Sequence, residues 1–227
     1  GEPTIIKEFY ELLEFCNDRK TLGDKKLMIT TNMTNTSKNL STWLGQVKNF
    51  TIHASIDGLE DRNKYIRFPC NWQSILKSLD FYKDIMHKHS KGGFSFAPAI
   101  QLLNIDQLLD LSKFFIDNFS TKHCRIAWVS QVRFPIICDY DILPSSYKHK
   151  VADDIEKNKK IINDPLTIEH LLQHAKDLRK ESYTNEQKQS YQKMFMQYND
   201  HQDKFRSTTS WRKLMPHLES ALTNSTR

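Results

Sequence analysis

The sequence is poor in glycine and proline and contains no long apolar run. Six glycines and seven prolines among 227 residues exclude collagen-like and low-complexity arrays. No uninterrupted apolar stretch approaches the ~20 residues that a helix needs to cross a bilayer, so we expect neither a transmembrane segment nor a membrane partner. The chain opens with Gly1-Glu2-Pro3 and shows no signal or transit pattern.

Cysteine is also scarce, and its spacing excludes a local zinc signature. The four cysteines are Cys16, Cys70, Cys124 and Cys138, and no two of them are separated by only two residues. Such low usage favours a reducing compartment over a disulfide scaffold. We therefore expect a cytoplasmic protein whose cysteines are buried or lie in loops. We expect no metal-binding residues in this sequence.

The composition nevertheless supports a folded and mildly basic protein. Hydrophobic residues make up 38% of the chain, which is enough for a core and excludes wholesale disorder. Lys and Arg number 33 against 27 Asp and Glu, a formal net charge of +6. No block of five or six like charges and no nucleic-acid motif is present, so we expect a solvated basic helical face and no nucleic-acid partner. A basic α/β nucleic-acid-binding domain that uses the helical C-terminal part is one functional alternative.

Hydrophobic periodicity predicts strands that alternate with helices over the first two thirds of the chain. We expect β-type segments at 27–31, 50–56, 94–100, 125–132 and 136–142. We expect helices at 4–20, 42–46, 72–87, 104–119, 146–163, 166–181, 185–205 and 209–222. This alternation predicts βαβ units and a parallel sheet over 1–143, followed by a mostly helical extension over 144–227.

Polar residues stand at the start of the chain and at the carboxyl ends of the first four expected strands. They are Gly1-Glu2-Pro3, Thr31-Asn32, Ser55-Ile56-Asp57-Gly58, Gln101 and Ser130-Gln131. In a parallel βα barrel the functional groups lie at the carboxyl ends of the strands, so these residues predict the mouth of a polar-ligand site. Asn, Asp, Ser and Gly are also common turn formers, and that structural interpretation stays open for each position.

Three segments carry a more specific pattern. Gly1-Glu2-Pro3 stands directly before an amphipathic helix, Thr31-Asn32 follows the next expected strand, and SIDGLEDRNKYIR runs from Ser55 to Arg67 with Trp72 beyond it. They resemble, in order and spacing, the Gly-Gly-Glu-Pro motif and later strand ends of radical S-adenosylmethionine (SAM) enzymes that carry twitch or SPASM extensions. Further similarity to twitch-domain proteins lies at Leu143-Pro144, Tyr147-Lys148 and 205–212.

The resemblance implies the second part of a partial (β/α)6 barrel over 1–143, truncated at its N-terminus, with a helical extension over 144–227. The chain would then start where a strand has just ended. It also implies a peptide or protein substrate.

The resemblance further implies which residues contact SAM. Glu2 would accept hydrogen bonds from the SAM ammonium group. Gly1 would allow close approach of the backbone. Arg67 would pair with the methionyl carboxylate through its planar fork. Ser55 and Asp57 would contact the ribose and the methionyl carboxylate region, and Asn32 would support the same pocket.

Structural alternatives exist for three of these residues. Glu2 could be an acidic residue favoured by a helix N-terminus, Arg67 could form a surface ion pair, and Asp57-Gly58 could be a turn.

The family holds a [4Fe-4S] cluster in a CxxxCxxC loop, and that motif is absent from these 227 residues. We expect it to lie upstream of Gly1. With the cluster and a reductant, the enzyme would cleave SAM reductively to a 5′-deoxyadenosyl radical, whereas this chain alone is expected to be inactive. The main alternative is a non-catalytic α/β binding or scaffold module.

Overall fold

The computed structural model describes residues 2–34, 36–89, 92–119, 124–126 and 131–225. Its contacts divide the chain into two compact units. Unit 1 comprises Gly1–Ile56, Asn71–Pro98 and Asp117–Trp128, and unit 2 comprises Asp57–Cys70, Ala99–Ile116 and Val129–Arg227. The helical extension predicted from residue 144 lies wholly in unit 2, together with three segments of the part predicted as a barrel, 57–70, 99–116 and 129–143.

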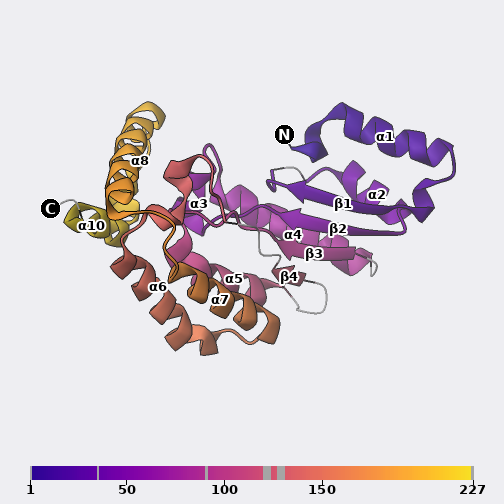
Figure 1. Ribbon diagram of the computed structural model, residues 1–227. Coiled ribbons are helices and arrows are strands. Elements are labelled where there is room, and N and C mark those ends of the chain that lie inside the picture. The colour runs from indigo at the N-terminus through magenta and orange to yellow at the C-terminus, as the bar shows by residue number, and fades with distance from the viewer. Residues whose placement is uncertain (1, 35, 90–91, 120–123, 127–130, 226–227) are drawn as a thin grey trace. The chain divides into compact units, whose positions relative to one another are not determined.

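Unit 1 is built on a parallel sheet whose strands follow one another in chain order. The strands are β1 (Lys26–Thr31), β2 (Asn49–Ala54), β3 (Gly92–Phe96) and β4 (Cys124–Ile126), paired in the order β1-β2-β3-β4 (Figure 1). Thr31 pairs with Ala54, and Ala54 with Phe96, so the carboxyl ends of three strands are level with one another. The predicted α/β class with a parallel sheet is confirmed.

The helices of unit 1 either precede β1 or connect successive strands. Before β1 come η1 (Pro3–Ile5), α1 (Lys7–Asp18) and η2 (Leu22–Asp24), and between strands lie α2 (Lys38–Gln46) and α4 (Trp72–Lys88). The side chains of Ser37 and Asn71 accept hydrogen bonds from the first turns of α2 and α4, respectively, as favoured helix caps do.

One face of the sheet forms the core of unit 1. Along β2, Phe50, Ile52 and Ala54 are buried while the residues between them are only half-buried. The ring of Tyr82, from α4, lies 5.9 Å from that of Phe94 on β3. The opposite face is more polar, and Met28 on β1 is 72% exposed there. The sheet is therefore one-sided in its packing, since its apolar residues alternate with polar ones.

Unit 2 is mostly helical. Its elements are α3 (Glu60–Ile66), η3 (Ile105–Gln107), most of α5 (Leu108–Asn118), η4 (Ile136–Cys138), η5 (Tyr140–Ile142), α6 (Ser145–Asn158), η6 (Lys159–Ile161), α7 (Pro165–Leu178), α8 (Asn185–Arg206), α9 (Trp211–Leu214) and α10 (Pro216–Ser225). The helices predicted in the C-terminal part are confirmed, but the last is divided before Pro216, which has no N–H to continue it.

Two expectations about individual segments were wrong. The β run predicted over 136–142 consists of η4 and η5, because the Asp139 carboxylate accepts a hydrogen bond from the Asp141 N–H and caps a tight turn. The strand predicted over 94–100 ends at Phe96, two residues before Pro98. Helix α3 was not predicted. Of the strand predicted over 125–132, residues 127–130 lie outside the described residues.

Within the described residues, no helix combines the length and the apolar composition that crossing a bilayer requires.

Candidate functional site

In unit 1, the Glu2 carboxylate ties the start of the chain to the end of β1. Its Oε2 accepts a hydrogen bond from the Asn32 N–H at 2.6 Å. Its Oε1 accepts hydrogen bonds from the N–H and the hydroxyl of Thr4, at 3.2 and 2.5 Å. Glu2 is only 8% exposed. These contacts show that Glu2 caps η1 and also fixes the segment after β1, so it is more than an exposed acidic residue.

The Glu2 carboxylate retains capacity for a ligand. Each carboxylate oxygen can accept about two hydrogen bonds. Among the described residues, Oε1 has two donors, both from Thr4, whereas Oε2 has one, the Asn32 N–H. A further donor, such as an ammonium group, can therefore bind at Oε2. Burial is the main cause that raises the pKa of the Tyr82 phenol, and the charge on Glu2 raises it further.

Two more predicted residues lie at this edge of the sheet. Asn32 follows β1, and its Oδ1 accepts hydrogen bonds from the N–H and the hydroxyl of Thr34, at 3.1 and 2.6 Å. Ser55 follows β2, and its N–H donates to the Thr31 carbonyl at 2.9 Å. The structure thus brings Glu2, Asn32 and Ser55 to the carboxyl ends of neighbouring strands. Gly1, predicted beside them, lies outside the described residues.

In unit 2, Asp57 and Arg67 form a close ion pair. Arg67 Nε lies 2.7 Å from Asp57 Oδ2, and the Asp57 side chain is 5% exposed. The Nε–H does not point at that oxygen as a hydrogen bond requires, so the contact is chiefly one of charge. Among the described residues, no carboxylate accepts a hydrogen bond from the terminal nitrogens of Arg67, which leaves them available to an anion.

The Asp57 carboxylate and backbone also hold two segments of unit 2 together. Its Oδ1 accepts a hydrogen bond from the Ala99 N–H at 2.7 Å. Its own N–H donates to Asn63 Oδ1, and its carbonyl accepts from Asn104 Nδ2, both at 2.9 Å. Sequence reasoning missed Asn63 and Asn104. Asn104 could have been noticed as a polar residue within the apolar run around Leu102 and Ile105, where it is fully buried.

The cysteines that the structure describes do not form a metal site. Cys16, Cys70 and Cys138 are free thiols. Burial raises the pKa of Cys70 and of Cys138, which disfavours the thiolate that a metal needs. No group of three or more His, Cys, Asp or Glu side chains in the described ranges could hold a metal ion. These residues therefore do not fit a [4Fe-4S] cluster.

The predicted site residues thus fall into two groups that are described separately. Glu2, Asn32 and Ser55 belong to unit 1, and Asp57 and Arg67 belong to unit 2. In each group one charged side chain retains unused hydrogen-bonding capacity, a carboxylate in the first and a guanidinium in the second. Comparison of the chain with models of protein families, with curated proteins and with solved structures gives no match.

Proposed function

We propose that this chain contributes SAM-binding residues to a radical SAM enzyme with a partial (β/α)6 barrel. The observation that supports the proposal best is the Glu2 carboxylate, buried at the carboxyl end of β1 and tethered to Asn32, with one acceptor position left. An α-ammonium group is a suitable donor for that position, because hydrogen bonds between two charged groups are the stronger ones.

The family resemblance, and not the placement of the two units, assigns the contacts to the methionyl end. Glu2 would bind the ammonium group and Ser55 would offer its hydroxyl. The two terminal nitrogens of Arg67 would bind the carboxylate. Asp57 would keep Arg67 oriented through the contact at Nε and would reach the ligand itself only through the second lone pairs of its oxygens.

The cluster is the part of this chemistry that these residues do not supply. When bound, a [4Fe-4S] cluster with a reductant supplies the electron that cleaves SAM to a 5′-deoxyadenosyl radical. Since the sequence has no CxxxCxxC, the 227 residues by themselves are expected to bind SAM without cleaving it. A peptide or protein is the expected substrate class.

The test is calorimetric titration of the chain with SAM and with two analogues, one lacking the amino group and one lacking the carboxylate. Glu2→Gln and Arg67→Met are each expected to weaken SAM binding by about tenfold or more, because each removes a hydrogen bond between charged groups. Glu8→Gln and Arg19→Met, which change exposed residues of the same types, should leave it unchanged.

The analogues separate the two contacts. The analogue without the amino group should be insensitive to Glu2→Gln, and the one without the carboxylate should be insensitive to Arg67→Met. Absence of SAM binding by folded protein at millimolar concentrations would overturn the proposal and favour the non-catalytic binding or scaffold module.

A further inference from the structure

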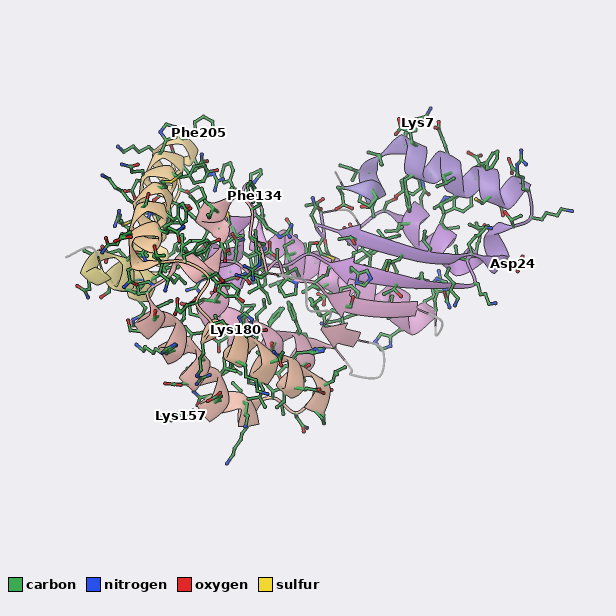
Figure 2. The ribbon with its side chains drawn as sticks, in the orientation of Figure 1. Lys7, Asp24, Phe134, Lys157, Lys180 and Phe205 are labelled. Atoms are coloured by element: carbon green, nitrogen blue, oxygen red, sulfur yellow. The ribbon has the colours of Figure 1, made fainter. Side chains whose placement is uncertain are left out.

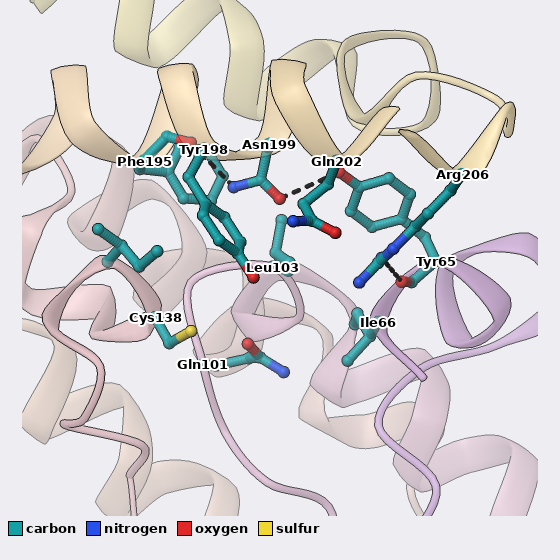
Figure 3. A pocket seen from close by; sticks show the side chains of 11 residues that line it. Tyr65, Ile66, Gln101, Leu103, Cys138, Phe195, Tyr198, Asn199, Gln202 and Arg206 are labelled. Atoms are coloured by element: carbon teal, nitrogen blue, oxygen red, sulfur yellow. Dashed lines mark hydrogen bonds between the residues drawn. The ribbon is translucent and has the colours of Figure 1, made fainter. Parts of the chain in front are cut away.

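One face of helix α8 lines a pocket in unit 2. The pocket measures about 130 Å³ and is shown in Figure 3. The lining residues that belong to α8 recur at helical spacing, which places them on one face of the helix. Its lining residues are Tyr65, Ile66, Gln101, Leu103, Ile137, Cys138, Phe195, Tyr198, Asn199, Gln202 and Arg206.

Hydrogen bonds fix one wall of this pocket. The Tyr65 hydroxyl donates to Asn199 Oδ1 at 3.0 Å, and Asn199 Nδ2 donates to the Phe195 carbonyl at 2.9 Å. Arg206 Nη1 donates to the Tyr65 carbonyl at 3.1 Å near the end of α3. Burial, aided by Asp203, raises the pKa of Tyr65, so its hydroxyl stays protonated and keeps donating. The wall is therefore formed before any ligand arrives.

Other polar groups of the pocket have no such partner. The side-chain amides of Gln101 and Gln202 and the Tyr198 hydroxyl make no hydrogen bond with any residue that the structure describes, nor do Nε and Nη2 of Arg206. In Figure 3 Gln202 and Arg206 extend from α8 toward Gln101 on the opposite side. These groups line one pocket, and each of them can donate hydrogen bonds to a ligand there.

The rest of the lining decides the kind of ligand. Ile66, Leu103, Ile137 and Phe195 provide an apolar surface, and Phe195 is almost fully buried. Arg206 is the one charged side chain among the eleven that line the pocket. Pockets for cofactor-sized ligands usually measure about 300–1,000 Å³, so this one suits a group of side-chain size that is apolar at one end and anionic at the other.

We propose that this pocket binds a carboxylate carried on a small flat apolar body. Arg206 and the amides of Gln101 and Gln202 would bind the carboxylate, and Phe195 with Leu103 would contact the apolar body. The carboxylate could belong to a free aromatic acid or to the C-terminal residue of a peptide. None of the lining residues is among those proposed to contact SAM, so this inference does not rest on that function.

The test is a titration of the whole chain, followed by NMR and calorimetry, with phenylacetate and its neutral counterpart phenylacetamide. Phenylacetate should bind with a Kd of about 1 mM and phenylacetamide about tenfold more weakly. A short peptide ending in phenylalanine, compared with its C-terminal amide, shows whether a peptide can supply the carboxylate. Tighter binding of the peptide acid than of phenylacetate assigns the pocket to chain ends, and the reverse assigns it to free acids.

Matched variants locate the binding. Gln202→Leu should weaken phenylacetate binding by about fivefold. Gln197→Leu changes the same residue type at an exposed position of α8 and should have no effect. Gln101→Leu, in a different segment, repeats the test if a change in α8 perturbs folding. Phenylacetate should also slow alkylation of Cys138, measured by mass spectrometry.

Three results would overturn the proposal. They are equal affinity for phenylacetate and phenylacetamide, unchanged affinity in both Gln202→Leu and Gln101→Leu, and absence of phenylacetate binding at about 20 mM, well above the expected Kd.

Discussion

Asp57 and Arg67 lie ten residues apart in the sequence, and their charged groups approach to 2.7 Å in unit 2. The carboxylate is nearly inaccessible at 5% exposed, whereas the guanidinium side chain keeps 28% of its surface exposed. The pair therefore anchors the arginine at Nε, and no described residue accepts a hydrogen bond from its other nitrogens. Asp57 acts as the fixed member and Arg67 as the one that can meet a ligand.

The first prediction concerns Asp57. Asp57→Ala leaves the Ala99 N–H and the Arg67 guanidinium without their partner, and should lower the free energy of unfolding by about 2–4 kcal/mol. Urea denaturation followed by circular dichroism measures the change. Asp61→Ala, at an exposed position of α3, should change stability by less than about 0.5 kcal/mol. Equal effects of the two variants would contradict the anchoring role.

Replacing Lys148, in α6, should also lower the free energy of unfolding, because its side chain is fully buried. Its Nζ donates to the Lys180 carbonyl at 2.5 Å and to Asp141 Oδ1 at 3.3 Å. Lys148→Met leaves the Asp141 charge undercompensated and should cost about 3–5 kcal/mol.

Two comparisons test this explanation. Lys157→Met, on the exposed side of α6, should have little effect on the denaturation midpoint. Adding Asp141→Asn to Lys148→Met should cost less than the sum of the single changes, because the stranded charge is removed. Strict additivity would show that the two side chains do not depend on each other.

His174 should make stability depend on pH. Burial lowers the pKa of this histidine to about 4, although the nearby charges of Asp177 and Asp141 oppose the shift, and its ring lies edge-on to Tyr140. Between its ordinary pKa of about 6.5 and 4, the unfolded chain binds a proton that the folded chain does not. Stability from this residue is therefore present above pH 6.5 and lost as the pH falls to 4, by up to about 3 kcal/mol.

The measurement compares the wild type with His174→Leu in urea at several pH values. The wild type should lose more stability than the variant between pH 6.5 and 4.5, while both lose stability similarly below pH 4 as carboxylates titrate. Parallel pH profiles would show that His174 is not buried in its neutral form.

Thr184 should contribute to stability as the cap of α8. Its Oγ1 accepts a hydrogen bond from the Gln187 N–H at 3.3 Å, and Gln187 Oε1 accepts one from the Thr184 N–H at 2.9 Å. Thr184→Ala removes this capping box and should lower the free energy of unfolding by about 1 kcal/mol. Ser190→Ala, exposed within the same helix, should be neutral or slightly stabilising because alanine has the higher helix propensity. Equal thermal midpoints for the two variants would argue against the cap.

Local signals in the sequence explain which helices and strands could be predicted. Strand β1 and helix α4 were predicted to within one residue, because their periodicity is strong. Prediction failed over 136–142, where apolar residues suggested a strand but the Asp139 side chain stabilises a turn. Helix α3 was missed because its sequence, EDRNKYI, is short and largely polar.

The site was predictable only as a set of positions. Sequence order placed Glu2, Asn32 and Ser55 after strands, and since parallel strands end at one edge, their proximity could be expected. An ion pair of Arg67 was one of the alternatives, but its partner, Asp57, was not foreseen, and neither was the burial of Asn104.

The sequence by itself determined the α/β class, most helices and strands, and the polar strand ends, because these depend on residue periodicity and turn chemistry within a few positions. Only the tertiary structure decided which polar groups are used internally and which are left for a ligand. It engages Asp57 with Ala99 and Arg67, and it brings Gln101 opposite Gln202 and Arg206 in the α8 pocket. Such pairings join residues far apart in the chain, and a hydrogen bond or ion pair requires atoms to approach within about 3 Å, which local pattern does not specify.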